Sequence, residues 1–233
     1  MPDTSPNMKL HTLFLAALLT GLSGAMMPGP VLALVVSETS RRGFVASPLI
    51  ITGHAILELV LVAALFLGLR RVLSAPAAFV VLGLAGGGVL IWMGQGMVAH
   101  GLDPTTELPL QATAVAAGRL LLAGAIISLA NPYWSLWWGT VGTKLLQMSV
   151  GHGAVGAAIY FLGHISSDYL WYSVVGWLVS FNRSIWVGAP YRYLLVACGS
   201  LILLMGVYFV YSAARRWLSH RLQRIRASTG SPG

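Results

Sequence analysis

Charged residues are scarce in this sequence: they occupy 9% of its 233 positions, whereas soluble domains carry about 25%. Hydrophobic residues reach 57%. A surface with so little charge cannot be wetted throughout, so most of it must face lipid. The composition therefore excludes a soluble globular domain, and it lacks the polar bias of a disordered chain.

Cysteine is nearly absent as well. Cys198 is the single one, which excludes an internal disulfide, a CxxC redox pair and a zinc site built from thiolates. The sequence also has no HExxH motif, no GxSxG motif and no nucleotide-binding glycine loop. These absences disfavour an intramembrane enzyme and an ATP-driven pump, and we expect no cofactor.

Six apolar segments are long enough to cross ~30 Å of hydrocarbon as helices. They are Thr12–Ser37, Phe44–Leu69, Val72–Ala99, Leu120–Thr143, Gly153–Phe181 and Tyr193–Ala214. The first resembles a secretory signal, but its apolar run continues well past the small residues that could be cleaved, so we expect a retained helix. The pattern predicts an all-α, multi-pass membrane protein with one transmembrane domain over residues 1–233.

The formal net charge of +8 does not indicate nucleic acid as a partner. Lys and Arg lie at the ends of the apolar segments and in the tail, as loop and lipid-headgroup anchors do. On a six-span topology, nine of the 14 lie on the side of both termini. The positive-inside tendency therefore predicts that both termini lie in the cytoplasm. We expect the protein in the cytoplasmic (inner) membrane.

The two halves of the chain echo each other, as repeat 1 (about 10–99) and repeat 2 (about 115–214), followed by a basic tail (215–233). Gly53-His54 precedes Glu58 in the second span, and Gly163-His164 precedes Asp168 at the same spacing in the fifth. Because each half has an odd number of spans, the halves insert with opposite orientation. This pattern predicts an inverted repeat, an architecture common in secondary transporters.

Proline-centred interruptions precede both Gly-His-acid motifs by one span. They consist of Pro28, Gly29 and Pro30 in the first span, and Asn131 and Pro132 in the fourth. A proline inside a helix removes a backbone donor, and in lipid the freed groups must be satisfied by protein or by a wet cavity. We expect broken helices there, with a half-helix starting near Val31 that offers its amide groups to an anion. The alternative is a plain packing kink.

The intramembrane acids and histidines are candidates for ion coupling. His54 with Glu58, and His164 with Asp168, are four residues apart and so share a helix face. Acids at that depth are costly and should face a cavity or a partner, where they can exchange a proton. The alternatives are a structural tie to an arginine or hydroxyl, or a metal site of four ligands, His54, Glu58, His164 and Asp168.

An aromatic run, residues 133–138, follows the second interruption. It is typical of an interfacial belt or a packing ridge. Alternatively, Tyr133 or Trp134 lines the cavity and contacts a substrate cation through its ring face. Both therefore join the predicted substrate-binding residues, with the two interruptions and the two acids.

This ordered set of residues resembles the LysE/RhtB family of amino-acid exporters over about Leu13 to Tyr208. The residues that carry the resemblance are Pro28, Gly29, Pro30, Arg42, Gly43, Phe44, Gly53, Glu58, Gly124, Asn131, Pro132, Gly163, Asp168, Trp171 and Tyr172. The resemblance implies six helices, export of amino acids or their derivatives, and proton-coupled exchange. His54 and His164 stand where that family commonly has small or apolar residues.

The sequence therefore predicts a secondary exporter of an amino acid or similar small solute, with a proton or other ion as the coupling partner. The alternative is a divalent metal exporter, because the wider superfamily that the chain resembles includes metal exporters. The 27 glycines allow either close internal helix packing or a homodimer.

Overall fold

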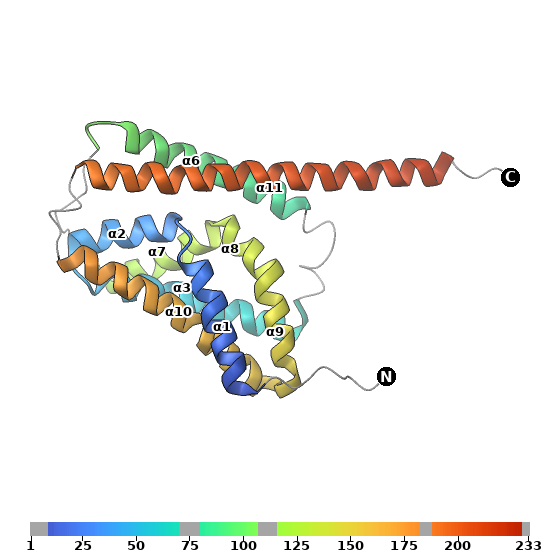
Figure 1. The fold of residues 1–233 in the computed structure, drawn as a ribbon, viewed down its shortest axis with the longest axis horizontal. Coiled ribbons are helices and arrows are strands. Elements are labelled where there is room, and N and C mark those ends of the chain that lie inside the picture. The colour runs from blue at the N-terminus through green and yellow to red at the C-terminus, as the bar shows by residue number, and fades with distance from the viewer. Residues whose placement is uncertain (1–8, 70–79, 107–115, 182–187, 230–233) are drawn as a thin grey trace.

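The computed structural model describes residues 9–69, 80–106, 116–181 and 188–229, and within them it contains helices and no strand. Figure 1 shows their arrangement. The α-helices are α1 (Leu10–Ala25), α2 (Pro30–Arg42), α3 (Ala46–Ala64), α6 (Gly87–Leu102), α7 (Ala117–Ala130), α8 (Pro132–Trp137), α9 (Thr143–Ser149), α10 (Gly153–Phe181) and α11 (Ala189–Thr229). Shorter turns of other helix types are η1 (Leu65–Leu69), η2 (Leu82–Gly86), η3 (Trp138–Gly142) and η4 (Val150–His152).

Several of these helices are long and apolar enough to cross a membrane. Ala46–Leu67 and Ala189–Ser219 are straight candidates. Leu10–Ala25 with Pro30–Arg42, and Ala117–Ala130 with Tyr133–Ser149, are bent pairs, with angles of 77° and 65°. The described residues thus supply two candidate spans, or four if each bent pair crosses as one unit, and both bends fall at the predicted interruptions.

The two bends have different local causes. α1 ends at Ala25, and Gly29 is extended before Pro30 opens α2, where proline lacks only a donor that the first turn does not use. No side chain caps α2. At the second bend, Asn131 is extended and its side-chain oxygen accepts a hydrogen bond from the Tyr133 amide at 3.1 Å, which caps α8.

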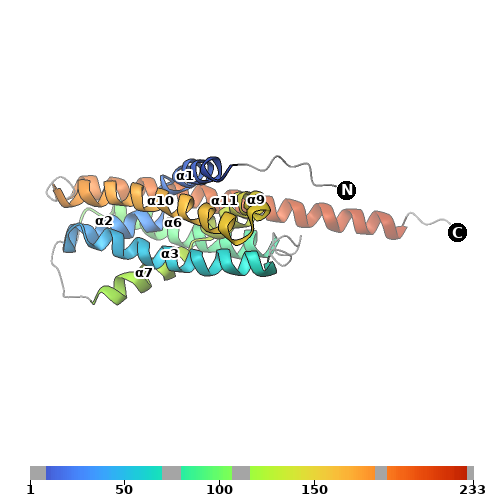
Figure 2. The same ribbon diagram turned by 90° about the horizontal axis from the view of Figure 1, so that it is seen from below.

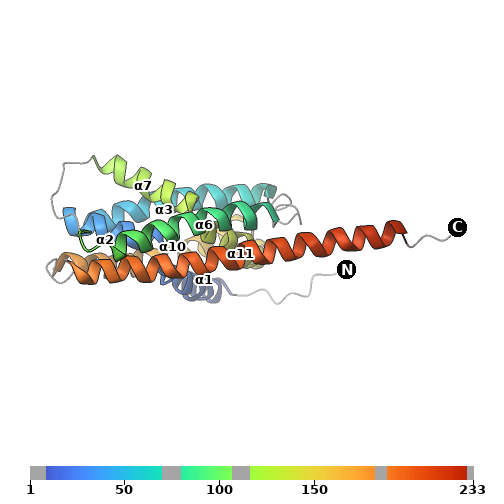
Figure 3. The same cartoon turned by 90° about the horizontal axis from the view of Figure 1, so that it is seen from above.

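Three helix pairs make the most extensive contacts, and α10 also packs on α3 and α2. α1 packs on α10, α3 on α7, and α6 on α11. Figures 1 and 3 show α6 running beside α11 along one edge of the bundle. Close approach requires glycine in the α3–α7 pair: a Cβ on Gly53 would lie 1.8 Å from the Leu121 carbonyl oxygen, and one on Gly124 would lie 1.9 Å from that of Ile50.

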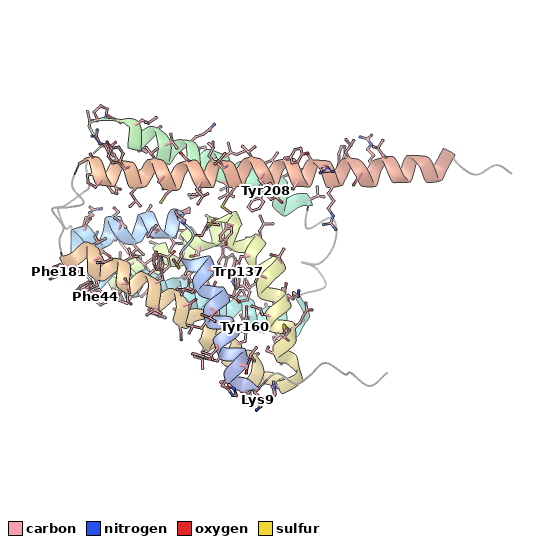
Figure 4. The ribbon with its side chains drawn as sticks, viewed as in Figure 1. Lys9, Phe44, Trp137, Tyr160, Phe181 and Tyr208 are labelled. Atoms are coloured by element: carbon pink, nitrogen blue, oxygen red, sulfur yellow. The ribbon has the colours of Figure 1, made fainter. Side chains whose placement is uncertain are left out.

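Buried apolar side chains form two separate clusters. The α2-side cluster consists of Ala25, Val31, Leu32, Val35, Val36, Ala46, Ile50, Ile51, Leu120, Tyr172, Val179, Tyr191, Leu195 and Cys198. The α9-side cluster consists of Leu13, Ala17, Val62, Leu65, Trp138, Leu146, Ala157 and Tyr160. In Figure 4, Phe44 and Phe181 lie at the end of the bundle near the α2-side cluster, and Lys9 lies at the opposite end, at the start of α1. Trp137 and Tyr160 lie between them.

The predicted basic tail is the continuation of α11, which runs without interruption for 41 residues, to Thr229. Figure 2 shows this helix projecting beyond the other helices on the side of the C-terminus. Some predicted features lie outside the described residues: part of the tail beyond Thr229, and the connections that hold Arg70, Arg71 and Arg183.

Candidate functional site

A cavity of about 70 Å³ lies at the junction of both helix breaks and both Gly-His-acid motifs. Its wall is formed by the segment from α1 to α2, by α3 and α10, by the Asn131 break with α8, and by α6 and α11. Its polar lining includes His54, Glu58, Ser128, Asn131, His164 and Asp168, and its apolar lining includes Leu90, Ile202 and Met205.

Four of these side chains form a compact group, which we call the tetrad: His54, Glu58, His164 and Asp168. The imidazole Nε2 atoms of His54 and His164 each lie 3.1 Å from Glu58, the first from Oε1 and the second from Oε2. Each Nε2 also lies close to Asp168 Oδ2, at 3.9 and 3.8 Å respectively. All four residues are buried. Helices α3 and α10 thus bring two acids and two bases from opposite halves of the chain together.

Two indole N–H groups hold the carboxylate of Glu58. Trp134 Nε1 donates a hydrogen bond to Glu58 Oε1 at 2.9 Å, and Trp138 Nε1 donates to the same oxygen at 2.8 Å. The two tryptophans are four residues apart, on one face of the helical segment that follows Asn131. Glu58 is only 1% exposed, so these donors replace water for a carboxylate that would be costly to bury alone.

The two imidazole rings are held differently. His54 Nδ1 lies 2.7 Å from Ser128 Oγ, and this hydroxyl in turn donates to the Gly124 carbonyl at 2.7 Å. His164 is stacked on the Trp137 ring, with centroids 4.6 Å apart and an interplanar angle of 26°. A hydrogen bond therefore orients the first ring, and aromatic packing orients the second.

Nearly all of the predicted site residues meet at this cavity. Those that line it are Pro28, Gly29, Pro30, His54, Glu58, Asn131, Tyr133, Trp134, His164 and Asp168. Pro132 is the first residue of α8. The indole N–H of Trp134 donates to Glu58, and contact of its ring face with a substrate cation stays a prediction.

Sequence reasoning missed three residues that shape the tetrad: Ser128, Trp137 and Trp138. Trp138 had a usable signal, because it lies one helical turn beyond Trp134 and follows the same face. Ser128 and Trp137 had none, because their roles depend on contacts between helices that are distant in the sequence.

The start of α2 forms another wall of the cavity, opposite in chemistry to the acids. Pro28, Gly29, Pro30 and Val31 line the cavity there. The first intrahelical bond of α2 runs from the Ala33 amide to the Gly29 carbonyl, so the amides of Val31 and Leu32 precede it and have no carbonyl of α2 to bond. With no side-chain cap, this helix start offers N–H groups and a positive dipole end to the cavity.

An apolar helical bundle with broken helices around a buried polar cavity defines a membrane transporter, and comparison with known proteins agrees. The model of the LysE type translocator family matches residues 22–213, so the chain belongs to this family. It is 32% identical over 202 residues to the chemotactic transduction protein ChpE of Pseudomonas aeruginosa, covering 82% of this chain and 94% of that protein. No solved structure matches the chain.

Proposed function

We propose that this transporter is a secondary exporter of an amino acid or a similar small zwitterion, coupled to protons. One observation carries the proposal: the start of α2 and the carboxylate of Asp168 line the same cavity. The α-carboxylate of the solute bonds to the amides of Val31 and Leu32, where the helix dipole favours an anion. Its ammonium group binds to Asp168.

Asp168 rather than Glu58 is the acid for the ammonium, because of how the two are surrounded. Glu58 already has two indole N–H donors on Oε1 and an imidazole nitrogen 3.1 Å from each oxygen. Asp168 Oδ2 has imidazole nitrogens only at 3.8 and 3.9 Å and accepts no hydrogen bond from the described residues. Its capacity to accept is therefore available to the solute.

Proton coupling follows from the shared imidazoles. His54 and His164 each approach both acids, so a proton held between an imidazole and Asp168 competes with the ammonium for that carboxylate. When the solute leaves on the outward side, a proton takes its place at the carboxylate from that side. Release of this proton on the cytoplasmic side frees Asp168 for the next solute. This exchange is an antiport, and it requires no nucleotide.

The helix pairing supports the six-span inverted repeat behind this mechanism. In the predicted repeat, α1 corresponds to α7, α3 to α10, and α6 to α11. Exchanging the two halves therefore turns the α1–α10 pair into the α7–α3 pair. It also turns the α6–α11 pair into itself. The observed pairs are α1–α10, α3–α7 and α6–α11, so the set is unchanged by the exchange, as two related halves require.

Alternating access uses the two apolar clusters as gates. The α2-side cluster contains the second half of the first broken span, and the α9-side cluster contains residues of η3 and α9, from the second half of the other broken span. Movement of either half-helix would open the cavity toward one side only. With both termini in the cytoplasm, the α9-side gate faces the cytoplasm and the α2-side gate faces outward.

The test is a counterflow assay with the purified protein in liposomes, using a panel of radiolabelled amino acids. For any amino acid that exchanges, we expect Asp168→Asn to lower its apparent affinity by about 10- to 100-fold, since a hydrogen bond to a charged group contributes about 1.5–3 kcal/mol. Glu58→Gln should reduce the dependence of transport on a pH gradient, because it removes the carboxylate that holds both imidazoles beside Asp168.

Asp103→Asn is the matched control, because Asp103 lies at the exposed end of α6 and bonds to the nearby Thr105. Its transport should equal that of the unmodified protein. Normal, proton-driven transport by both Asp168→Asn and Glu58→Gln would refute the mechanism.

A further inference from the structure

In the tetrad, hydrogen-bond acceptor atoms lie close together without a proton between them. Ser128 Oγ has one proton, which it donates to the Gly124 carbonyl, so it accepts from Nδ1–H of His54. A neutral imidazole protonated at Nδ1 carries a lone pair on Nε2. That lone pair lies 3.1 Å from Glu58 Oε1, itself an acceptor of two indole N–H groups. A positive charge at the centre of the tetrad would relieve this repulsion.

Three further atoms also indicate that a positively charged ligand belongs at the centre of the tetrad. Glu58 Oε2, His164 Nε2 and Asp168 Oδ2 are buried, and no hydrogen bond from the described part of the chain reaches them. Glu58, His164 and Asp168 are 1%, 5% and 5% exposed. Leaving buried polar atoms without partners costs about 1–3 kcal/mol each, so such atoms gathered at one point indicate a ligand.

The spacing of these atoms suits a metal ion. Ligand atoms of His54, Glu58 and Asp168 all lie within 4.8 Å of one another. The nitrogen–oxygen separations in the tetrad run from 3.1 to 3.9 Å. Ligands about 2.0 Å from a tetrahedral Zn²⁺ are about 3.3 Å apart, which falls inside this range. We propose that the tetrad is a binding site for a divalent transition-metal ion of the Zn²⁺ class.

The surroundings of His54 and Glu58 match those of metal ligands, whereas Nδ1 of His164 has no hydrogen-bond partner among the described residues. A metal-binding imidazole usually donates its other N–H to a fixed acceptor, and Ser128 accepts this bond from His54. The indoles of Trp134 and Trp138 occupy Glu58 Oε1, which leaves Oε2 to bind the metal. Trp137 fixes the ring plane of His164 by stacking.

The ligand types favour Zn²⁺, Co²⁺ or Ni²⁺ over Mg²⁺. Imidazole nitrogen suits these metals, whereas Mg²⁺ prefers six oxygen ligands and retains several waters. Two imidazoles and two carboxylates also give an uncharged centre once a divalent ion is bound. The metal would bind the Asp168 oxygen that the proposed function leaves for the ammonium group, so metal and solute exclude each other at this carboxylate. The metal site itself does not require the solute to be an amino acid.

The experiment titrates the detergent-purified full chain with Co²⁺ and then with Zn²⁺. We expect one equivalent of Co²⁺ to give the intense visible absorption of a four-coordinate ion, and Zn²⁺ to displace it. His164→Gln and Asp168→Asn should each weaken Zn²⁺ binding by about 10-fold or more, as loss of a ligand does. His100→Gln, on the exposed end of α6, should bind as the unmodified protein does.

Each variant is first checked for a single size-exclusion peak and for unchanged helicity, so that misfolding is not read as lost binding. The unmodified protein alone can overturn the proposal: absence of stoichiometric Co²⁺ absorption would show that protons balance the tetrad. Equal loss of binding in His100→Gln and His164→Gln would also overturn it. Amino-acid counterflow in metal-free buffer is measured in parallel, so that failure of this site and failure of the proposed function are separable.

Discussion

At the scale of single residues, the main question is how the carboxylate of Glu58 is stabilised inside an apolar bundle. Its Oε1 accepts from Trp134 and from Trp138, and the imidazoles of His54 and His164 lie beside its two oxygens. Charge-assisted hydrogen bonds are about twice as strong as neutral ones. The tryptophans therefore stabilise this carboxylate, and they also pack in the α9-side cluster (Trp138) or against it (Trp134).

Trp138→Phe removes one of these donors while keeping an aromatic ring. We expect a loss of about 1.5–3 kcal/mol in stability, since Oε1 loses a hydrogen bond to a charged group. The measurement is the melting temperature of the protein in detergent. Trp92→Phe, at a side chain that is 74% exposed, is the control and should change it little.

A double mutant identifies the origin of that loss. In a Glu58→Gln background, the same Trp138→Phe change should cost less, because the hydrogen bond is no longer charge-assisted. An equal cost in both backgrounds would mean that Trp138 acts by packing alone.

The candidate site residues were predictable where the signal is local. His54 with Glu58 and His164 with Asp168 could be paired from helical spacing, and their depth in apolar segments predicted a polar centre. The contact between the two pairs could not be derived, because it depends on how α3 and α10 cross. The sequence likewise offered no reason to select Ser128 among the many hydroxyl residues. It lies beside His54 because α3 and α7 pack together.

At the scale of helices, prolines predict where a span breaks but not how far it turns. Pro30 and Pro132 each begin the new helix, as the first-turn preference of proline requires. The bends of 77° and 65° depend on what the second halves pack against, which the local sequence does not encode. The unequal capping was also hidden, since Asn131 could serve either carbonyls or amides and the structure shows it bonded to an amide.

Gly124→Ala tests the close approach of α3 and α7. The added methyl group would lie 1.9 Å from the Ile50 carbonyl oxygen, so the helices must separate. We expect destabilisation of about 1–3 kcal/mol, as for other overpacked positions, measured as a lower melting temperature in detergent. Gly96→Ala on α6 is the control, because nothing lies within 4 Å of its added carbon; an equal effect there would contradict the packing argument.

At the scale of the whole molecule, the polar cavity lies between two apolar clusters at opposite ends of the bundle. Phe44 and Phe181 mark the α2-side end and Lys9 the other (Figure 4). The charge pattern along the chain predicts that the Lys9 end is cytoplasmic. The sequence could supply this orientation, but not the clusters, whose members come from helices in both halves.

Single-cysteine labelling checks the orientation. The native Cys198 is fully buried and would be replaced by alanine. In intact cells, a membrane-impermeant maleimide should label Phe44→Cys, because that residue is exposed at the end predicted to face outward. It should label Lys9→Cys only after permeabilisation. The opposite pattern would reverse the topology, and with it the assignment of the two gates.

The wall formed by α6 and α11 has a consequence for which molecules such a carrier accepts. Leu90, Ile202 and Met205 offer no hydrogen bond, and methionine adapts its shape to whatever it touches. In the proposed binding mode, the other walls bind both charged ends of a zwitterion, so this wall contacts only the remainder of the molecule. This apolar wall can accommodate a methyl group or short branched chains of different shapes. A second charged group would contact hydrocarbon there without a hydrogen-bond partner. We therefore expect a carrier that sorts its cargo by polarity and tolerates variation in form.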